Sequence, residues 1–143
     1  MAFRGTFDHS LDAKNRLTVP SKFRAALSGG IVVAAGIEPC VAIWPAADYD
    51  AYVERSVAQF PELSPQRRQM TRFFSANAFD AELDSAGRVM VPPKLLTHAG
   101  LTKEAVVVGA ESCLELWDRE AWAEYDADLS PEQITQSLGH AAS

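Results

Sequence analysis

The chain contains one twelve-residue pattern twice, and this internal repeat constrains its fold more than any other feature. Residues 11–22 read LDAKNRLTVPSK and residues 83–94 read LDSAGRVMVPPK, which agree at six positions and lie 72 residues apart. Further along, CVAIW at 40–44 and CLELW at 113–117 repeat at an offset of 73. Two copies of a unit of about 70 residues predict a duplicated fold, because a solenoid needs three or more stacked repeats.

Each copy is predicted to form a strand, a tight turn, a second strand, a short helix, a hairpin and a closing helix. Asn15 and Gly87 occupy the same place in the two turns, and these residue types adopt positive φ most readily. Pro20 and Pro92 follow short alternating segments, so each marks the start of a helix. The expected elements are helices near 21–27 and 93–98, hairpins joining 31–36 to 40–44 and 105–109 to 113–117, and closing helices near 46–59 and 118–127.

The two copies are predicted to share one core, because a unit of about 70 residues with exposed strand edges is marginal alone. Interleaving their strands would give an α+β, mainly β, barrel-like domain. Ser64-Pro65 predicts a helix near 65–76, and Ser130-Pro131 begins a last short helix before a frayed tail from Gly139 to Ser143. The expected divisions are a first repeat at 1–59, a linking helix at 60–77, a second repeat at 78–128, and a C-terminal helix and tail at 129–143.

Charge is unevenly distributed along the chain. The formal net charge is −6, but residues 1–75 carry nine basic and seven acidic side chains, whereas residues 76–143 carry four and twelve. Because salt screens surface fields beyond about 8–10 Å, a local basic face can bind phosphate on an acidic protein. No apolar run approaches the roughly 20 residues of a membrane helix, and the N-terminus lacks the apolar segment of a signal peptide. We therefore expect a cytoplasmic protein without membrane contact, for which nucleic acid is not excluded.

Residues typical of catalytic or metal sites are few and scattered. Cys40 and Cys113 occupy equivalent positions, which indicates small buried side chains in the reduced state. The three histidines (His9, His98 and His140) have no metal-ligand spacing, and His98 is expected to be structural. No glycine-rich phosphate loop or nucleophile elbow is present, and solvation explains the abundant carboxylates. We expect no cofactor, and an enzyme is the least favoured alternative.

The repeated Asp-x-x-(Gly/Asn)-Arg turn has two interpretations. Either Asp accepts backbone N–H bonds in a tight turn and Arg merely ends an exposed strand, or a rigid hairpin tip presents Arg to DNA. A planar guanidinium donates two hydrogen bonds to guanine O6 and N7, which contributes about 1–3 kcal/mol of discrimination. The turn occurs in both copies and is followed by Val-Pro each time, which favours the second interpretation. Lys14 adds a possible phosphate contact to the first turn that Ala86 cannot provide in the second.

Several segments together resemble one known family over essentially the whole chain. They are Phe3-Arg4-Gly5-Thr6, both Leu-Asp-x-x-(Gly/Asn)-Arg-x-x-Val-Pro motifs, and Leu114-Glu115-Leu116-Trp117-Asp118, which are similar to those of the MraZ family. The single motif is shared with the wider AbrB and MazE group of swapped-hairpin DNA binders. The resemblance implies two tandem AbrB-like β-loop-β-helix units in a double swapped-hairpin fold, a ring-like homo-oligomer and nucleoid association. It also implies binding to short direct repeats upstream of the protein's own division and cell-wall operon.

The same resemblance assigns DNA-facing residues in the two turns. Carried over by position, they are Asp12, Lys14, Asn15 and Arg16 in the first copy, with Asp84, Gly87 and Arg88 in the second. Arg24 matches a further basic position, although its repeat partner is Leu96. Asn15 replaces the glycine usual in the first turn, and because asparagine tolerates the left-handed conformation we expect a turn of similar shape.

Two other groups of residues have structural explanations that we favour. Arg67, Arg68 and Arg72 could contact phosphate, but we expect them to form a solvated helix face or a subunit contact. Trp44, Trp117 and Trp122 could stack on bases. We expect Trp44 and Trp117 to anchor the core instead, because they occupy equivalent apolar positions in the repeat.

The sequence therefore predicts a non-enzymatic transcriptional regulator that binds double-stranded DNA and represses its own operon by occluding the promoter. The alternative is an antitoxin-like module that holds a protein partner through the acidic, partly helical segment 118–143, although the duplication speaks against it. RNA is disfavoured as the ligand because the chain lacks the exposed aromatic platforms of RNA-binding modules.

Overall fold

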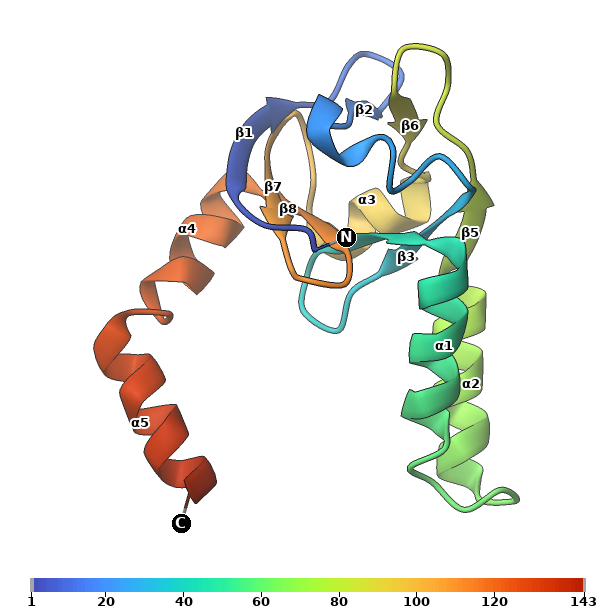
Figure 1. Ribbon diagram of the computed structural model, residues 1–143, viewed down its shortest axis with the longest axis vertical. Helices are drawn as coiled ribbons and strands as arrows, with labels where there is room; N and C mark the ends of the chain where they lie inside the picture. The colour runs from blue at the N-terminus through green and yellow to red at the C-terminus, as the bar shows by residue number, and fades with distance from the viewer. Residues whose placement is uncertain (1, 143) are drawn as a thin grey trace.

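The computed structural model describes residues 2–142 and shows an α+β fold with mostly antiparallel sheet and five α-helices in that range (Figure 1). The strands are β1 (Thr6–Ser10), β2 (Arg16–Thr18), β3 (Ile31–Ala35), β4 (Val41–Pro45), β5 (Ala78–Ala81), β6 (Arg88–Met90), β7 (Glu104–Gly109) and β8 (Leu114–Asp118). The helices are the 3-10 turn η1 (Ser21–Phe23) and α1 (Ala46–Val57), α2 (Pro65–Ala76), α3 (Pro93–Ala99), α4 (Arg119–Ala127) and α5 (Pro131–Ala142).

Strand pairing crosses between the two copies of the repeat. The larger sheet has the order β1-β7-β8-β4-β3-β5, so the first strand of each copy pairs with the third strand of the other. A separate ladder pairs β2 with β6, with Leu17 opposite Val89. Both the strand order and this register are unchanged when the two copies are exchanged, which describes a pseudo-twofold arrangement. Each copy thus completes the sheet of the other, as expected for units too small to fold alone.

The central strands are buried on both faces, which explains why they read as continuous apolar runs. Successive side chains of a strand point to opposite faces. Alternate residues such as Ile43 and Leu116 face a core shared with β2, β6 and α3. On the other face, Trp44 packs against α1 and Trp117 packs against α4. Both tryptophans are buried, as predicted, at 7 % and 1 % exposure.

The predicted helix near 65–76 is confirmed as α2, with Ser64 Oγ accepting a hydrogen bond from Arg67 N at 3.1 Å. The predicted helix near 21–27 is wrong beyond its first turn. Only η1 forms, and backbone bonds of the i to i+3 type continue to Ser28. These tighter turns bring Phe23 and Leu27 into the core, and burial of two large side chains outweighs helix propensity.

The frayed tail expected from Gly139 is also wrong for the residues that the structure describes. The last helix, α5, continues through Gly139 to Ala142, while Ser143 lies outside the described range. One interior glycine costs only about 1 kcal/mol relative to alanine, which does not end a helix already capped by Ser130. No helix within residues 2–142 is long and apolar enough to cross a membrane.

Candidate nucleic-acid interface

Both Asp-x-x-x-Arg turns lie at one end of the molecule. We call residues 12–16 the first tip and residues 84–88 the second tip. Figure 1 shows the loops that contain them side by side at the top, above β2 and β6, while α1–α2 and α4–α5 extend toward the bottom. The crossed strand pairing causes this placement. Each tip leads directly into β2 or β6, and these two strands pair with each other.

The first tip is organised around the Asp12 carboxylate. It accepts hydrogen bonds from the backbone N–H of Lys14 and Arg16, both at 2.9 Å, and from Arg16 Nε at 2.8 Å. Asn15 adopts the left-handed conformation expected of it, with φ of 57°. The turn therefore has the closed shape that the sequence predicted.

The second tip repeats this geometry. The Asp84 carboxylate accepts bonds from Ala86 N at 2.9 Å, and from the N and Nε atoms of Arg88 at 2.8 Å each. Gly87 has φ of 75°. The matching shapes show that asparagine and glycine serve the same role in the two turns.

Each tip arginine is bound through Nε, and its side chain remains partly exposed. The side chains of Arg16 and Arg88 are 28 % and 35 % exposed. In both, Nε is engaged by the aspartate of the same tip, and no Nη hydrogen bond occurs within the described residues. The two interpretations of the turn are therefore compatible, since the aspartate both fixes the backbone and binds Nε, which leaves the Nη groups of a partly exposed guanidinium available to a ligand.

Backbone hydrogen bonds join the two tips to each other. Val19 N donates to Gly87 O, and Val91 N donates to Asn15 O, both at 2.9 Å. Beneath them, Leu17 and Val89 are 0 % and 2 % exposed. The tips consequently form one rigid surface rather than two independent loops.

The predicted site residues lie in the tip of their own copy, except for Arg24, which lies against the second tip. Lys14 is exposed on the first tip. Arg24, a residue of the first copy, lies against Gly87 in the second tip and donates from Nε to Val19 O at 3.0 Å. A surface hollow of about 340 Å³ beside it is lined by Arg24, Ser28, Glu82, Leu83, Asp84, Ser85 and Gly87. Sequence reasoning did not single out Ser28, Glu82 or Ser85. Glu82 and Ser85 reach Arg24 only because the copies cross, whereas Ser28 follows Arg24 by four residues in the same copy.

Hydrogen bonding lowers the pKa of both tip aspartates. The largest cause is the backbone N–H of Arg16 for Asp12 and of Arg88 for Asp84, with smaller contributions from the arginine side chains. A carboxylate whose pKa is depressed in the folded state stabilises that state above its unfolded value, about 3.9, and loses this effect as the pH falls through the lower folded value.

We therefore expect both tips to stay closed at neutral pH and to loosen only in strong acid. Carboxyl-carbon NMR titration should give midpoints below about 3.9 for Asp12 and Asp84. In an Arg16→Ala variant the midpoint of Asp12 should rise toward that value while Asp84 stays unchanged. A midpoint at or above the ordinary value in the wild type would contradict the tip geometry.

The other arginine cluster lies far from the tips. Arg67 Nη1 donates to Phe60 O at 3.3 Å and Arg68 Nη1 donates to Leu63 O at 2.8 Å, so both fasten the loop between α1 and α2. Figure 1 places this loop at the opposite end of the molecule. Two of the three arginines therefore have a structural role, although it is to hold this loop and not the solvated helix face or subunit contact that the sequence predicted.

The cysteines and His98 also have structural roles, in core packing and in joining α3 to a turn. Cys40 and Cys113 are buried free thiols, and each packs beside the tryptophan of the other copy. Burial raises the pKa of both thiols, that of Cys113 to about 12, so they remain protonated at neutral pH. His98 Nε2 lies 3.0 Å from Gly36 O and ties α3 to the β3–β4 turn. Within residues 2–142, no group of His, Cys, Asp or Glu side chains is arranged to hold a metal.

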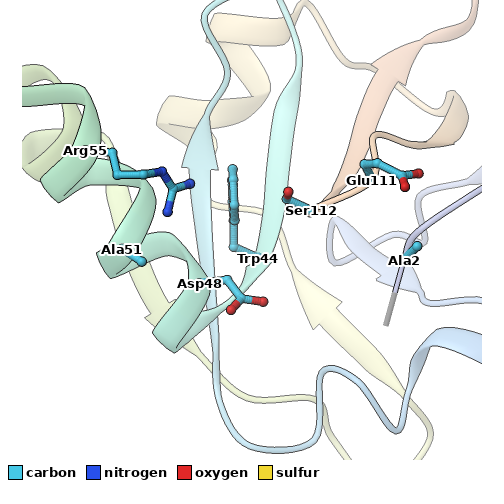
Figure 2. Close-up of a pocket in the computed structure, with 7 residues that line it drawn as sticks. All are labelled: Ala2, Trp44, Asp48, Ala51, Arg55, Glu111 and Ser112. Atoms are coloured by element: carbon cyan, nitrogen blue, oxygen red, sulfur yellow. The ribbon is translucent and has the colours of Figure 1, made fainter. Parts of the chain in front are cut away.

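A second hollow, of about 390 Å³, lies on the flank of the molecule (Figure 2). The Trp44 side chain stands at its centre, with Asp48 and Arg55 of α1 on one side and Glu111 and Ser112 on the other. Arg4 pairs with Glu111 at 3.0 Å, and both side chains are largely exposed. Its mixed charges, and a lining that includes no residue of either tip, set it apart from the surface described above.

Comparison with known proteins agrees with the internal repeat. A family model described as "MraZ protein, putative antitoxin-like" matches twice, at residues 2–73 and 74–140. A protein named transcriptional regulator MraZ from Lactobacillus delbrueckii subsp. bulgaricus is 37% identical over 138 residues, which cover 95% of this chain and 96% of the relative. Relatives of the same name from Pediococcus pentosaceus (39% over 122 residues, 85% of each chain) and Lachnoclostridium phytofermentans (39% over 130 residues, 91% of each chain) are equally similar. The chain therefore belongs to the MraZ family.

Proposed function

We propose that this protein is a transcriptional regulator that binds double-stranded DNA in a sequence-specific manner through its two tips. The observation that carries the proposal is the placement of Arg16 and Arg88, each oriented by an aspartate, on one rigid surface. The name transcriptional regulator, which the relatives bear, supports this reading and supports a role other than catalysis.

The chemistry of the tips suits readout of base edges in the major groove. With Nε engaged by aspartate, the two Nη groups of each arginine can donate in parallel to guanine O6 and N7. Lys14, exposed beside Arg16, is suited to a phosphate, which positions the protein without reading sequence. Base readout and phosphate binding are thus assigned to different side chains.

Assembly would multiply the weak binding of single tips. We propose that the two repeats, 1–59 and 78–128, form an AbrB-like double swapped hairpin, and the crossed strand pairing supports this. A ring-like homo-oligomer would present several pairs of tips to short direct repeats upstream of the protein's own operon. Because linked binding events reinforce one another, such an oligomer would occupy the promoter tightly and repress transcription in the nucleoid.

The test is a titration of the full chain against a fluorescent duplex from upstream of its own gene, with a scrambled duplex as control. We expect tight, salt-sensitive binding to the first duplex only, weakened about tenfold or more by Arg16→Ala. Arg55→Ala, which removes an arginine from the flank of α1, should bind like the wild type. Equal weak binding to both duplexes, indifferent to Arg16, would refute the proposal.

An antitoxin-like protein partner is the second candidate. The amphipathic helix α5 supports it, because Ile134 and Leu138 are 43 % and 66 % exposed on a helix packed against little else. Purification with the neighbouring gene products should distinguish the two. A stoichiometric partner that is lost on truncation after residue 128, with no DNA binding, would favour this candidate.

A further inference from the structure

The paired strands β2 and β6 form a two-stranded ribbon that is separate from the larger sheet. Successive side chains of a strand point to opposite faces, and Leu17 and Val89 point into the core. The residues on either side of them therefore share the outward face, which consists of Arg16, Thr18, Arg88 and Met90. The major groove of DNA is wide enough to admit a two-stranded ribbon, so this whole face, and not the turns alone, has the shape to enter it.

Met90 is the apolar member of the outward face. It is 57 % exposed and lies directly opposite Arg16 in the ladder. The next pair along the ladder is joined by the bond from Val91 N to Asn15 O, so the pair of Arg16 and Met90 is of the type without backbone hydrogen bonds. Pairs of this type bring the two side chains closest together. Met90 and Arg16 consequently extend side by side from the ribbon.

The fold itself does not require an apolar side chain at this position. By the repeat, Met90 corresponds to Thr18, which is also exposed and lies opposite Arg88. Met90 borders a hollow of about 280 Å³ whose lining includes Phe79 and Pro92, yet it remains mostly in solvent. Methionine is flexible and polarisable, and it is frequent at binding surfaces for that reason. Its place beside Arg16, rather than its exposure alone, points to a contact with the ligand.

An apolar side chain in the major groove has one matching group among the four bases. Guanine, adenine and cytosine present hydrogen-bonding groups there, whereas thymine also presents its C5-methyl group. Opposite side chains in a ladder begin about 4.5–5.5 Å apart, and successive base pairs are stacked about 3.4 Å apart. A base that Met90 contacts would therefore lie within one or two base pairs of the guanine that suits Arg16.

We infer that Met90 reads a thymine by packing on its C5-methyl group, next to the base pair that Arg16 contacts. The inference rests on the proposed function and adds an apolar contact, specific for a second base, to the hydrogen bonds of the arginines. Burial of one methyl group between Met90 and the base excludes water from both, which favours thymine over the other bases at that position.

Deletion of single thymine methyl groups tests this contact directly. In the duplex from upstream of the gene, each thymine is replaced in turn by deoxyuridine, which lacks the methyl group but keeps every hydrogen-bonding group. We expect the wild type to lose about three- to fivefold in affinity at a thymine within two base pairs of a guanine. Substitution of that guanine should weaken the wild type but not the Arg16→Ala variant further.

A double-mutant cycle assigns the methyl group to Met90. Met90→Ala should weaken binding to the unmodified duplex by a similar factor and should no longer respond to deoxyuridine, so that the two changes are strongly non-additive. Met90→Leu keeps an apolar side chain of similar volume and should retain the response. Leu63→Ala is the matched control, because it removes an apolar side chain that is 88 % exposed in the loop between α1 and α2, and it should bind like the wild type. Thermal unfolding reports whether each variant is folded.

Two results would overturn the inference alone. One is a deoxyuridine response in Met90→Ala equal to that of the wild type, or no response at any thymine. The other is a Met90→Ala variant whose assembled mass changes while its response to the methyl group does not, since Met90 would then contact another copy of the chain. In both cases the proposed function stands if Arg16→Ala still weakens binding to this duplex and the scrambled duplex is not bound. Indifference to Arg16 and to scrambling would overturn both.

Discussion

A Leu17→Ala variant should lose about 2–5 kcal/mol of unfolding free energy, because it opens a cavity in the buried core beneath the tips. Leu17 is 0 % exposed and lies opposite Val89, where the ladder of β2 and β6 crosses the pseudo-twofold axis. One substitution thus removes support from both tips at once. Urea unfolding gives the free energy, and DNA titration under conditions where the variant stays folded should show both tips weakened.

Met90→Ala is the matched control in the same ladder. Met90 pairs with Arg16 across the strands, but its side chain is 57 % exposed. We expect a change of about 0.5 kcal/mol or less. A loss below about 1 kcal/mol for Leu17→Ala, or equal losses for the two variants, would mean that this ladder does not support the tips as the structure indicates.

Local residue chemistry was enough to predict the turns and most helices. The tip turns follow from an aspartate that satisfies nearby N–H groups and a residue that tolerates positive φ, and both determinants lie within five consecutive positions. The start of α2 follows in the same way from Ser64 and Pro65. These features depend on residues that are neighbours in sequence, so they can be predicted from the sequence alone.

Features that depend on the choice between equivalent partners could not be predicted in the same way. The first strand of each copy meets two chemically similar third strands, and local sequence does not say which one it pairs with. The position of Arg24 in the second tip follows from that choice, and so does the contact with Gly87. The helix predicted near 21–27 was wrong for a related reason, because packing into a core that both copies build decides the conformation of this segment.

Trp117→Ala should lower the free energy of unfolding by about 3–5 kcal/mol, through a cluster that lies outside the tips. The indole is 1 % exposed and donates from Nε1 to Glu115 at 3.1 Å. It meets Trp122 edge-on and Tyr125 at a tilt, with ring centroids at 5.4 and 4.8 Å. This cluster is the main apolar attachment of α4 to the sheet. The exposed pairs of Arg119 with Glu104 and Asp8 add little in solvent.

The same variant tests whether the helical arm is separable from the tips. Without the indole, α4 should detach together with α5, so limited proteolysis should cleave near 128–130 before the sheet unfolds. Trp122→Ala is the control, because its ring is partly exposed already and should cost about 1–2 kcal/mol. At temperatures where Trp117→Ala remains folded, the tips should retain wild-type affinity for DNA, since the β2–β6 ladder and its hydrogen bonds lie elsewhere. Loss of binding by a folded Trp117→Ala variant would instead mean that the arm itself takes part in holding DNA or in joining copies of the chain.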